Sequence, residues 1–161
     1  MDAGKILVAQ SQGIYILKFT GDVRLSLCST LDQYIDRMFA DKQFKTVIID
    51  LTETQCIDST SLGLLAKISI LYKERFNTVP TITSTNDDIN RILSSMGFDQ
   101  VFYIVKQLVS KVEHLDELPA KTVSEVDMRD TVLEAHKLLM SLNDSNRAAF
   151  QDLVNSLEKI D

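Results

Sequence analysis

The chain has 161 residues, of which 45% are hydrophobic, and its formal net charge is −6 at pH 7. This is enough for one compact domain with a hydrophobic core plus a small appendage. The negative charge, without any basic cluster, argues against binding to nucleic acid or to an anionic membrane surface, because both depend on Lys and Arg. Cys28 and Cys56 have neither metal-binding nor redox spacing, so we expect a protein of the reducing cytoplasm. We expect neither a membrane span, which needs about 18 apolar residues, nor a signal peptide.

The first part of the chain predicts a β-hairpin followed by a helix and a strand. Residues 6–9 and 14–19 are short β-rich runs joined by a glycine-containing turn. Apolar residues then recur at helical spacing from about Ser26 to Phe39. Residues 46–51 are apolar at both odd and even positions, which predicts a central strand covered on both faces.

The next part continues the alternation of helices and strands. We expect a helix, a strand, a short helix, a strand and a helical stretch at about residues 60–76, 78–84, 87–96, 101–105 and 106–114. The order up to residue 112 is therefore ββαβαβαβα. It predicts an α/β domain with a mixed sheet, parallel strand pairs, right-handed crossovers and helices packed against the sheet.

The C-terminal part predicts a separate helical hairpin. Residues 116–121 are typical of a linker, and residues 123–161 form two helical patterns joined at residues 143–145. Both patterns carry an apolar stripe, so we expect the two helices to pack on each other rather than to offer a groove to a partner. The predicted organisation is an α/β domain at 1–112, a linker at 113–122 and a two-helix extension at 123–161.

The stretch from Lys45 to Leu64 is the candidate functional region. A buried strand ends at Asp50-Leu51, a polar loop is expected at residues 52–55, and a helix then begins among several hydroxyl side chains. A helix N-terminus has unpaired N–H groups and a partial positive charge, so it suits an anion. Ser59 therefore has two possible roles, which are to cap the helix or to carry a phosphate.

Other chemistry is not supported by the sequence. His114 and His136 are far apart and have no His or Cys at ligand spacing, so we expect no metal. Ser59 lacks the flanking glycines of a nucleophile elbow, and the α/β part contains no histidine that could serve as its base. A glycine-rich phosphate-binding loop is absent as well. We expect neither a cofactor nor catalysis.

The run Val47–Leu51, followed by Ile57-Asp58-Ser59-Thr60-Ser61-Leu62-Gly63, resembles the STAS domain of bacterial anti-sigma factor antagonists. The likeness covers about residues 4–112. In that family the serine directly after the aspartate is phosphorylated, which implies Ser59 here. Ser61 stands where many members have Gly or Ala. The helical extension resembles that of a proteobacterial subgroup that controls biofilm or related surface behaviours.

The resemblance implies a non-enzymatic switch in signal transduction and transcription regulation. The unphosphorylated form would bind an anti-sigma factor, a GHKL-type serine kinase or another regulator. Phosphorylation of Ser59 would release that partner, and a PP2C-type phosphatase would reverse the change. The predicted partner-binding residues are Gly21, Asp22, Asp58, Ser59, Thr60, Ser61 and Leu62. The alternative is a STAS scaffold or ligand-sensing module that is never phosphorylated.

Overall fold

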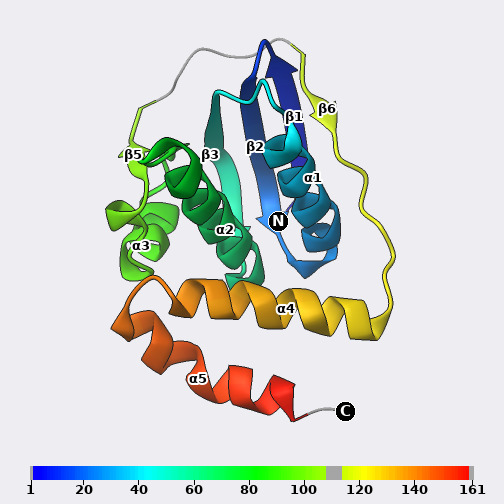
Figure 1. Ribbon diagram of the computed structural model, residues 1–161, viewed down its shortest axis with the longest axis vertical. Helices are drawn as coiled ribbons and strands as arrows, with labels where there is room; N and C mark the ends of the chain where they lie inside the picture. The colour runs from blue at the N-terminus through cyan, green and yellow to red at the C-terminus, as the bar shows by residue number, and fades with distance from the viewer. Residues whose placement is uncertain (1, 108–113, 160–161) are drawn as a thin grey trace.

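The computed structural model describes residues 2–107 and 114–159 and is built around a six-stranded mixed sheet (Figure 1). The strand order is β5-β4-β3-β2-β1-β6. β1 (Lys5–Ser11) and β2 (Ile14–Val23) form an antiparallel hairpin, with Gln12 and Gly13 at positive φ in the turn. The predicted hairpin is confirmed.

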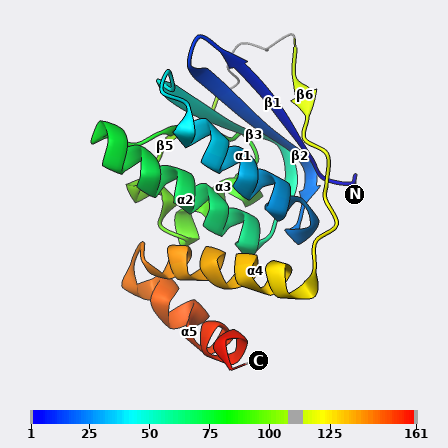
Figure 2. The same ribbon diagram turned by 45° about the vertical axis from the view of Figure 1, so that its right-hand side comes forward.

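The remaining main strands run parallel to β2, as the alternating order predicts. They are β3 (Thr46–Ile57), β4 (Thr81–Thr83) and β5 (Tyr103–Val105). The crossover helices are α1 (Cys28–Ala40), α2 (Ser59–Phe76) and α3 (Asp87–Ser95), with the short 3-10 helices η1 (Leu25–Leu27) and η2 (Phe98–Gln100) beside them. α1 and α2 lie next to each other over one face of the sheet (Figure 2).

β3 is longer than the sequence predicts, and the expected polar loop at residues 52–55 is wrong. β2 and β3 stay paired as far as Val23 and Ile57, with two register shifts on the way. Thr54 is buried within this extended part, where its hydroxyl donates to the backbone oxygen of Phe19 at 2.8 Å. Because the buried hydroxyl has an acceptor, the strand continues through a polar segment. The extension carries β3 directly to the start of α2.

The two faces of β3 differ, so the prediction of a strand covered on both sides is also wrong. Val47, Ile49 and Leu51 are completely buried, whereas Ile48 and Asp50 on the opposite face are only half-buried. Side chains alternate between the faces of a strand. One face of β3 is therefore fully buried, and Ile48 on the other face retains contact with solvent.

The segment after β5 departs from the predicted helix and linker. The predicted helix at 106–114 falls mostly on residues 108–113, outside the described part of the chain. Within the predicted linker, β6 (Asp116–Glu117) pairs antiparallel with β1, and the next amide, of Leu118, donates to Ile6 at 2.8 Å. Leu118 is buried in the core. This anchoring explains why a segment of linker-like composition forms a strand.

The C-terminal helices are α4 (Glu125–Met140) and α5 (Asp144–Glu158), which confirms the two predicted helices. α4 crosses the N-terminal end of α2, and α5 turns back beneath α4 (Figures 1 and 2). Leu139 of α4 is completely buried within the core of the α/β domain. The apolar side of α4 is thus shared between α5 and the domain. In the described part of the chain, the helices are too short or too polar to cross a membrane.

A hydrogen bond between Tyr15 and Asp41 gives the fold a pH dependence. The Tyr15 hydroxyl donates to Asp41 Oδ2 at 2.6 Å, just after the end of α1. Burial, together with this bond, raises the pKa of Tyr15 to about 12, and the same bond lowers the pKa of Asp41. The raised pKa of Tyr15 stabilises the fold fully below about pH 10, and this stabilisation is lost as the pH rises toward 12. The lowered pKa of Asp41 has the opposite sign, so its stabilisation is lost in acid.

Replacing Tyr15 by phenylalanine is expected to flatten this pH profile. The ring keeps its packing against Phe44, at a centroid distance of 5.5 Å, but the hydroxyl is removed. The urea midpoint should fall at pH 7, and it should depend less on pH both below about 4 and above about 10. Urea unfolding across the pH range measures this. A profile with the same shape as that of the original chain would show that the Tyr15–Asp41 contact does not contribute.

Candidate functional site

The start of α2 is capped by Asp58, not by Ser59. Asp58 has extended backbone angles, φ −82° and ψ 168°, and its Oδ1 accepts from the amide of Ser61 at 2.8 Å. An aspartate at this position satisfies one of the free N–H groups of the first turn. Ser59 is therefore the first residue of the helix proper, and its hydroxyl is not required for capping.

The Ser59 hydroxyl instead contacts a histidine from the C-terminal extension. Ser59 Oγ lies 2.8 Å from Nε2 of His136, in the C-terminal half of α4. The other ring nitrogen, Nδ1, lies 2.7 Å from the carbonyl oxygen of Val132. Because a carbonyl can only accept, Nδ1 carries a proton, and in the neutral ring Nε2 accepts the proton of Ser59. His136 is only 2% exposed, and the ring of Phe150 from α5 packs against it at 5.1 Å.

Two close approaches hold α4 and α5 against the domain. At Gly63 of α2, an added Cβ would lie 2.2 Å from the carbonyl oxygen of Ala135, so only glycine permits this helix crossing. At the other end, Asn146 is buried, and its side-chain amide donates to the carbonyl oxygens of Met96 and Leu139 at 2.9 and 3.0 Å. The extension is therefore fixed to both α2 and the end of α3.

The predicted partner-binding residues at the start of α2 are less accessible than expected. Thr60, Ser61 and Leu62 are buried, while Asp58 and Ser59 are half-buried. A docking surface for a partner has to be accessible, whereas here α4 crosses that end of α2.

Ser61 faces the interior of the domain. Its Oγ lies 3.3 Å from the sulfur of Cys28 in α1, and burial raises the pKa of the Cys28 thiol to about 12. A thiol with so high a pKa is unreactive at neutral pH. Ser61 is therefore packed within the core. Among the neighbouring hydroxyls of Ser59, Thr60 and Ser61, that of Ser59 belongs to the least buried residue.

Gly21 and Asp22 belong to β2. Gly21 is buried, and Asp22 is half-buried and paired with Arg24 at 2.5 Å. The amide of Asp58 donates to the carbonyl of Val23 at 3.1 Å, which places the end of β2 beside the start of α2. The two predicted regions thus meet in space, although neither is freely exposed.

Sequence reasoning missed His136 as a neighbour of Ser59, because this histidine lies in the C-terminal extension and not in the α/β part. His136 follows Val132 by four residues and precedes Leu139 by three, so helical spacing places it on the buried side of α4. That spacing was the available signal, but no pattern shows that α4 lies over α2. A serine and a histidine in contact could form a nucleophile and its base. Here, however, a backbone carbonyl orients the ring, and the imidazole is buried.

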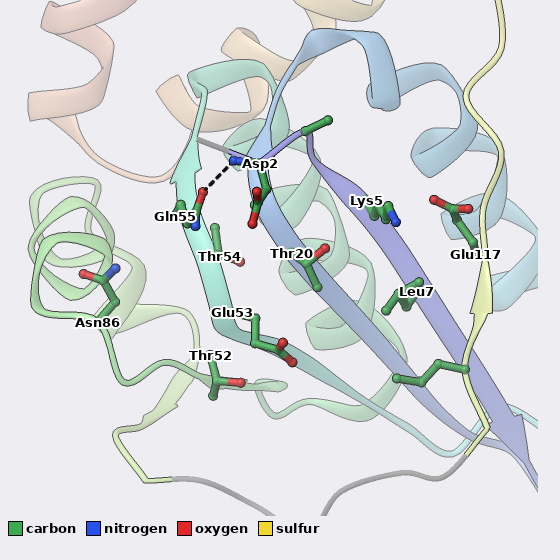
Figure 3. A pocket seen from close by; sticks show the side chains of 13 residues that line it. Asp2, Lys5, Leu7, Thr20, Thr52, Glu53, Thr54, Gln55, Asn86 and Glu117 are labelled. Carbon is green, nitrogen blue, oxygen red and sulfur yellow. Dashed lines mark hydrogen bonds between the residues drawn. The ribbon is translucent and has the colours of Figure 1, made fainter.

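A cavity lies elsewhere, near the carboxyl ends of β2 and β3 (Figure 3). It is open, has a volume of about 870 Å³, and its lining includes Lys5, Thr20, Glu53 and Asn86. Asp2 lies over it, and its amide donates to the side chain of Gln55 at 3.2 Å. Ser59 and His136 do not line this cavity. Across residues 2–107 and 114–159, no cluster of three or more His, Cys, Asp or Glu side chains could hold a metal ion.

Comparison with known proteins identifies the fold. The model of the STAS domain family matches residues 5–115. The structure is similar to that of an anti-sigma factor antagonist from Mycobacterium paratuberculosis, with 21% identity and a TM-score of 0.55 over 66% of this chain and 88% of that chain. A candidate anti-sigma factor antagonist from Thermotoga maritima has 19% identity and a TM-score of 0.55, over 63% and 86% of the two chains. No curated protein matches the sequence. The family match ends before α4 and α5.

Proposed function

The chain belongs to the STAS domain family, and from this premise we propose that it is an anti-sigma factor antagonist controlled by phosphorylation of Ser59. The unphosphorylated form binds an anti-sigma factor, a GHKL-type serine kinase or another regulator. The kinase transfers the γ-phosphoryl group of ATP to the Ser59 oxygen, and a PP2C-type phosphatase removes it by hydrolysis. The protein itself is a non-enzymatic, cytoplasmic regulator.

The position of Ser59 is the observation that carries this proposal. Asp58 caps α2, which leaves the Ser59 hydroxyl at the first helical position without a structural role in the cap. The motif Asp58-Ser59-Thr60 follows β3 directly and lies within the residues that match the STAS domain. The solved structures that resemble it are described as anti-sigma factor antagonists, which supports the general role.

The electrostatics favour a switch at the binding surface rather than unfolding of the domain. A phosphate adds about 1.5 to 2 negative charges and three acceptor oxygens. Negative charge at a helix N-terminus is stabilising, although the carboxylate of Asp58 acts against this. If the phosphate repels the partner, each ~1.4 kcal/mol of repulsion weakens binding tenfold.

Two substitutions at Ser59 are expected to have opposite effects on partner binding. Ser59→Ala should bind the partner constitutively, because it cannot be phosphorylated. Ser59→Asp should bind at least about tenfold more weakly, which corresponds to ~1.4 kcal/mol of repulsion. Pull-downs with the two variants as baits, compared side by side, measure this. Equal capture by both baits would contradict the proposed switch.

The alternative is a scaffold or ligand-sensing module that is never phosphorylated, and the open cavity near Lys5 and Glu53 is the feature that favours it. Incubation with the candidate kinase and ATP, followed by intact-mass measurement, distinguishes the two functions. The proposed switch requires a mass increase of one phosphoryl group that is absent from Ser59→Ala. A ligand-sensing module would show no such increase.

A further inference from the structure

We propose that α4 is an internal mask of the switch surface and that docking of α4 and phosphorylation of Ser59 exclude each other. This inference rests on the proposed function, because it concerns regulation of the same serine. α4 lies directly over the start of α2, with His136 opposite Ser59 and Ala135 opposite Gly63. In this closed arrangement the extension occupies the place that a kinase or a protein partner must reach.

A phosphoryl group on Ser59 would replace the hydrogen bond that joins Ser59 to His136. The distance of 2.8 Å between Oγ and Nε2 of His136 accommodates one shared proton. A phosphoryl group places a phosphorus atom and three further oxygens on Oγ, and it also removes the proton that Oγ donates. Nε2 then loses its hydrogen-bond donor in a side chain that is only 2% exposed.

His136 cannot turn aside while α4 stays docked. Its ring is fixed by Val132 within α4, at 2.7 Å, and by the ring of Phe150 in α5. The backbone of α4 is in turn fixed by its close approach to Gly63. The conflict between the phosphate and His136 is therefore relieved by movement of the whole α4–α5 unit rather than by rotation of one side chain.

The extension is attached by polar contacts as well as by the buried Leu139. Asn146 and Asn143 both donate to the carbonyl oxygen of Met96, at 2.9 and 3.3 Å, and Ser59 bonds to His136. Water can replace hydrogen bonds of this kind when the helices separate. Because coupling between two sites is reciprocal, a phosphate that disfavours docking implies that docking disfavours the phosphate. The closed form thus resists both phosphorylation and partner binding.

Hydrogen exchange of the full chain tests the mask without any kinase. Phosphoserine is installed at position 59 by genetic encoding, and amide exchange is followed by mass spectrometry. The control carries phosphoserine at position 11, where Ser11 is exposed at the β1–β2 hairpin, the end of the sheet opposite α4 (Figure 1). We expect peptides of α4 and α5 to exchange about tenfold faster or more in the position-59 protein only, the effect of one lost buried hydrogen bond.

Both other outcomes overturn the proposal. Unchanged or slower exchange in α4 and α5 would show that the closed form accommodates the phosphate, for example as an ion pair with protonated His136. Faster exchange throughout the sheet would show that the charge unfolds the domain instead of opening the mask.

A variant far from Ser59 tests whether α4 masks the partner surface or forms part of it. Asn146→Ala removes the bonds to Met96 and Leu139 while leaving the Ser59 region intact. If α4 is a mask, this variant should capture more of the partner that Ser59→Ala retains. Weaker capture by a folded Asn146→Ala would assign α4 to the docking surface and overturn the mask. If exchange responds to phosphoserine while capture does not depend on Ser59, the mask stands and the proposed function fails.

Discussion

Replacing Gly63 by alanine is expected to release α4 from the domain. At this position a Cβ would lie 2.2 Å from the carbonyl oxygen of Ala135 and 2.7 Å from its Cβ. These neighbours are backbone atoms and a short side chain, so they cannot rotate away. Overpacking of this kind costs about 1–3 kcal/mol. Hydrogen exchange in α4 and α5 should therefore become roughly ten- to a hundredfold faster.

In α2 considered alone, Gly63→Ala would raise the stability of the helix. The sign of the measured change therefore shows whether α4 packs on this residue. Alanine in a helix interior is about 1 kcal/mol more favourable than glycine. If α4 did not pack on Gly63, the variant would be more stable than the original chain. Faster exchange confined to the extension supports the close crossing, whereas higher stability with unchanged exchange would show that α4 does not dock there.

Two neighbouring isoleucines in β3 are expected to differ strongly when each is replaced by alanine. Ile49 is completely buried beneath the helices, and Ile48 is half-buried on the opposite face. Removing buried atoms of this size costs about 2–5 kcal/mol, through lost burial and a residual cavity. Ile49→Ala should therefore lower Tm by roughly 5–15 °C.

Ile48→Ala is the matched control, because the residue type, the strand and the deleted atoms are the same. Its half-exposed side chain loses less contact, so we expect less than half the effect of Ile49→Ala. Thermal unfolding of both variants provides the comparison. Equal losses would mean that the second face of the sheet is as well covered as the first, contrary to the half-burial of Ile48 and Asp50.

Local patterns were sufficient to predict most of the α/β domain. The turn at Gly13 and the apolar spacing of the helices are properties of short segments, and they appear where expected. Two errors came from partners that are distant in sequence. Residues 52–55 are polar like a loop, but pairing with β2 makes them part of β3. Asp116 and Glu117 resemble a linker, but the free edge of β1 makes them a strand.

At the candidate site, too, the contact between distant residues could not be predicted from local patterns. The position of Ser59 at the beginning of a helix could be predicted, because the change from strand to helix is visible in the sequence. Its contact with His136 joins residues that are 77 positions apart. Helical spacing indicates that His136 faces inward, but the element that it faces depends on how the extension folds back. The covering of Ser59 therefore became visible only with the three-dimensional arrangement.

The short strand β6 has a consequence for solubility. Without it, β1 would form an open sheet edge whose free N–H and C=O groups could recruit a strand from another molecule. β6 occupies part of that edge with two residues, Asp116 and Glu117, whose carboxylates are exposed. The opposite edge, β5, has only three residues. Intermolecular strand addition, the first step of many aggregation pathways, is thus disfavoured at both sides of the sheet by brevity and, beside β1, by negative charge.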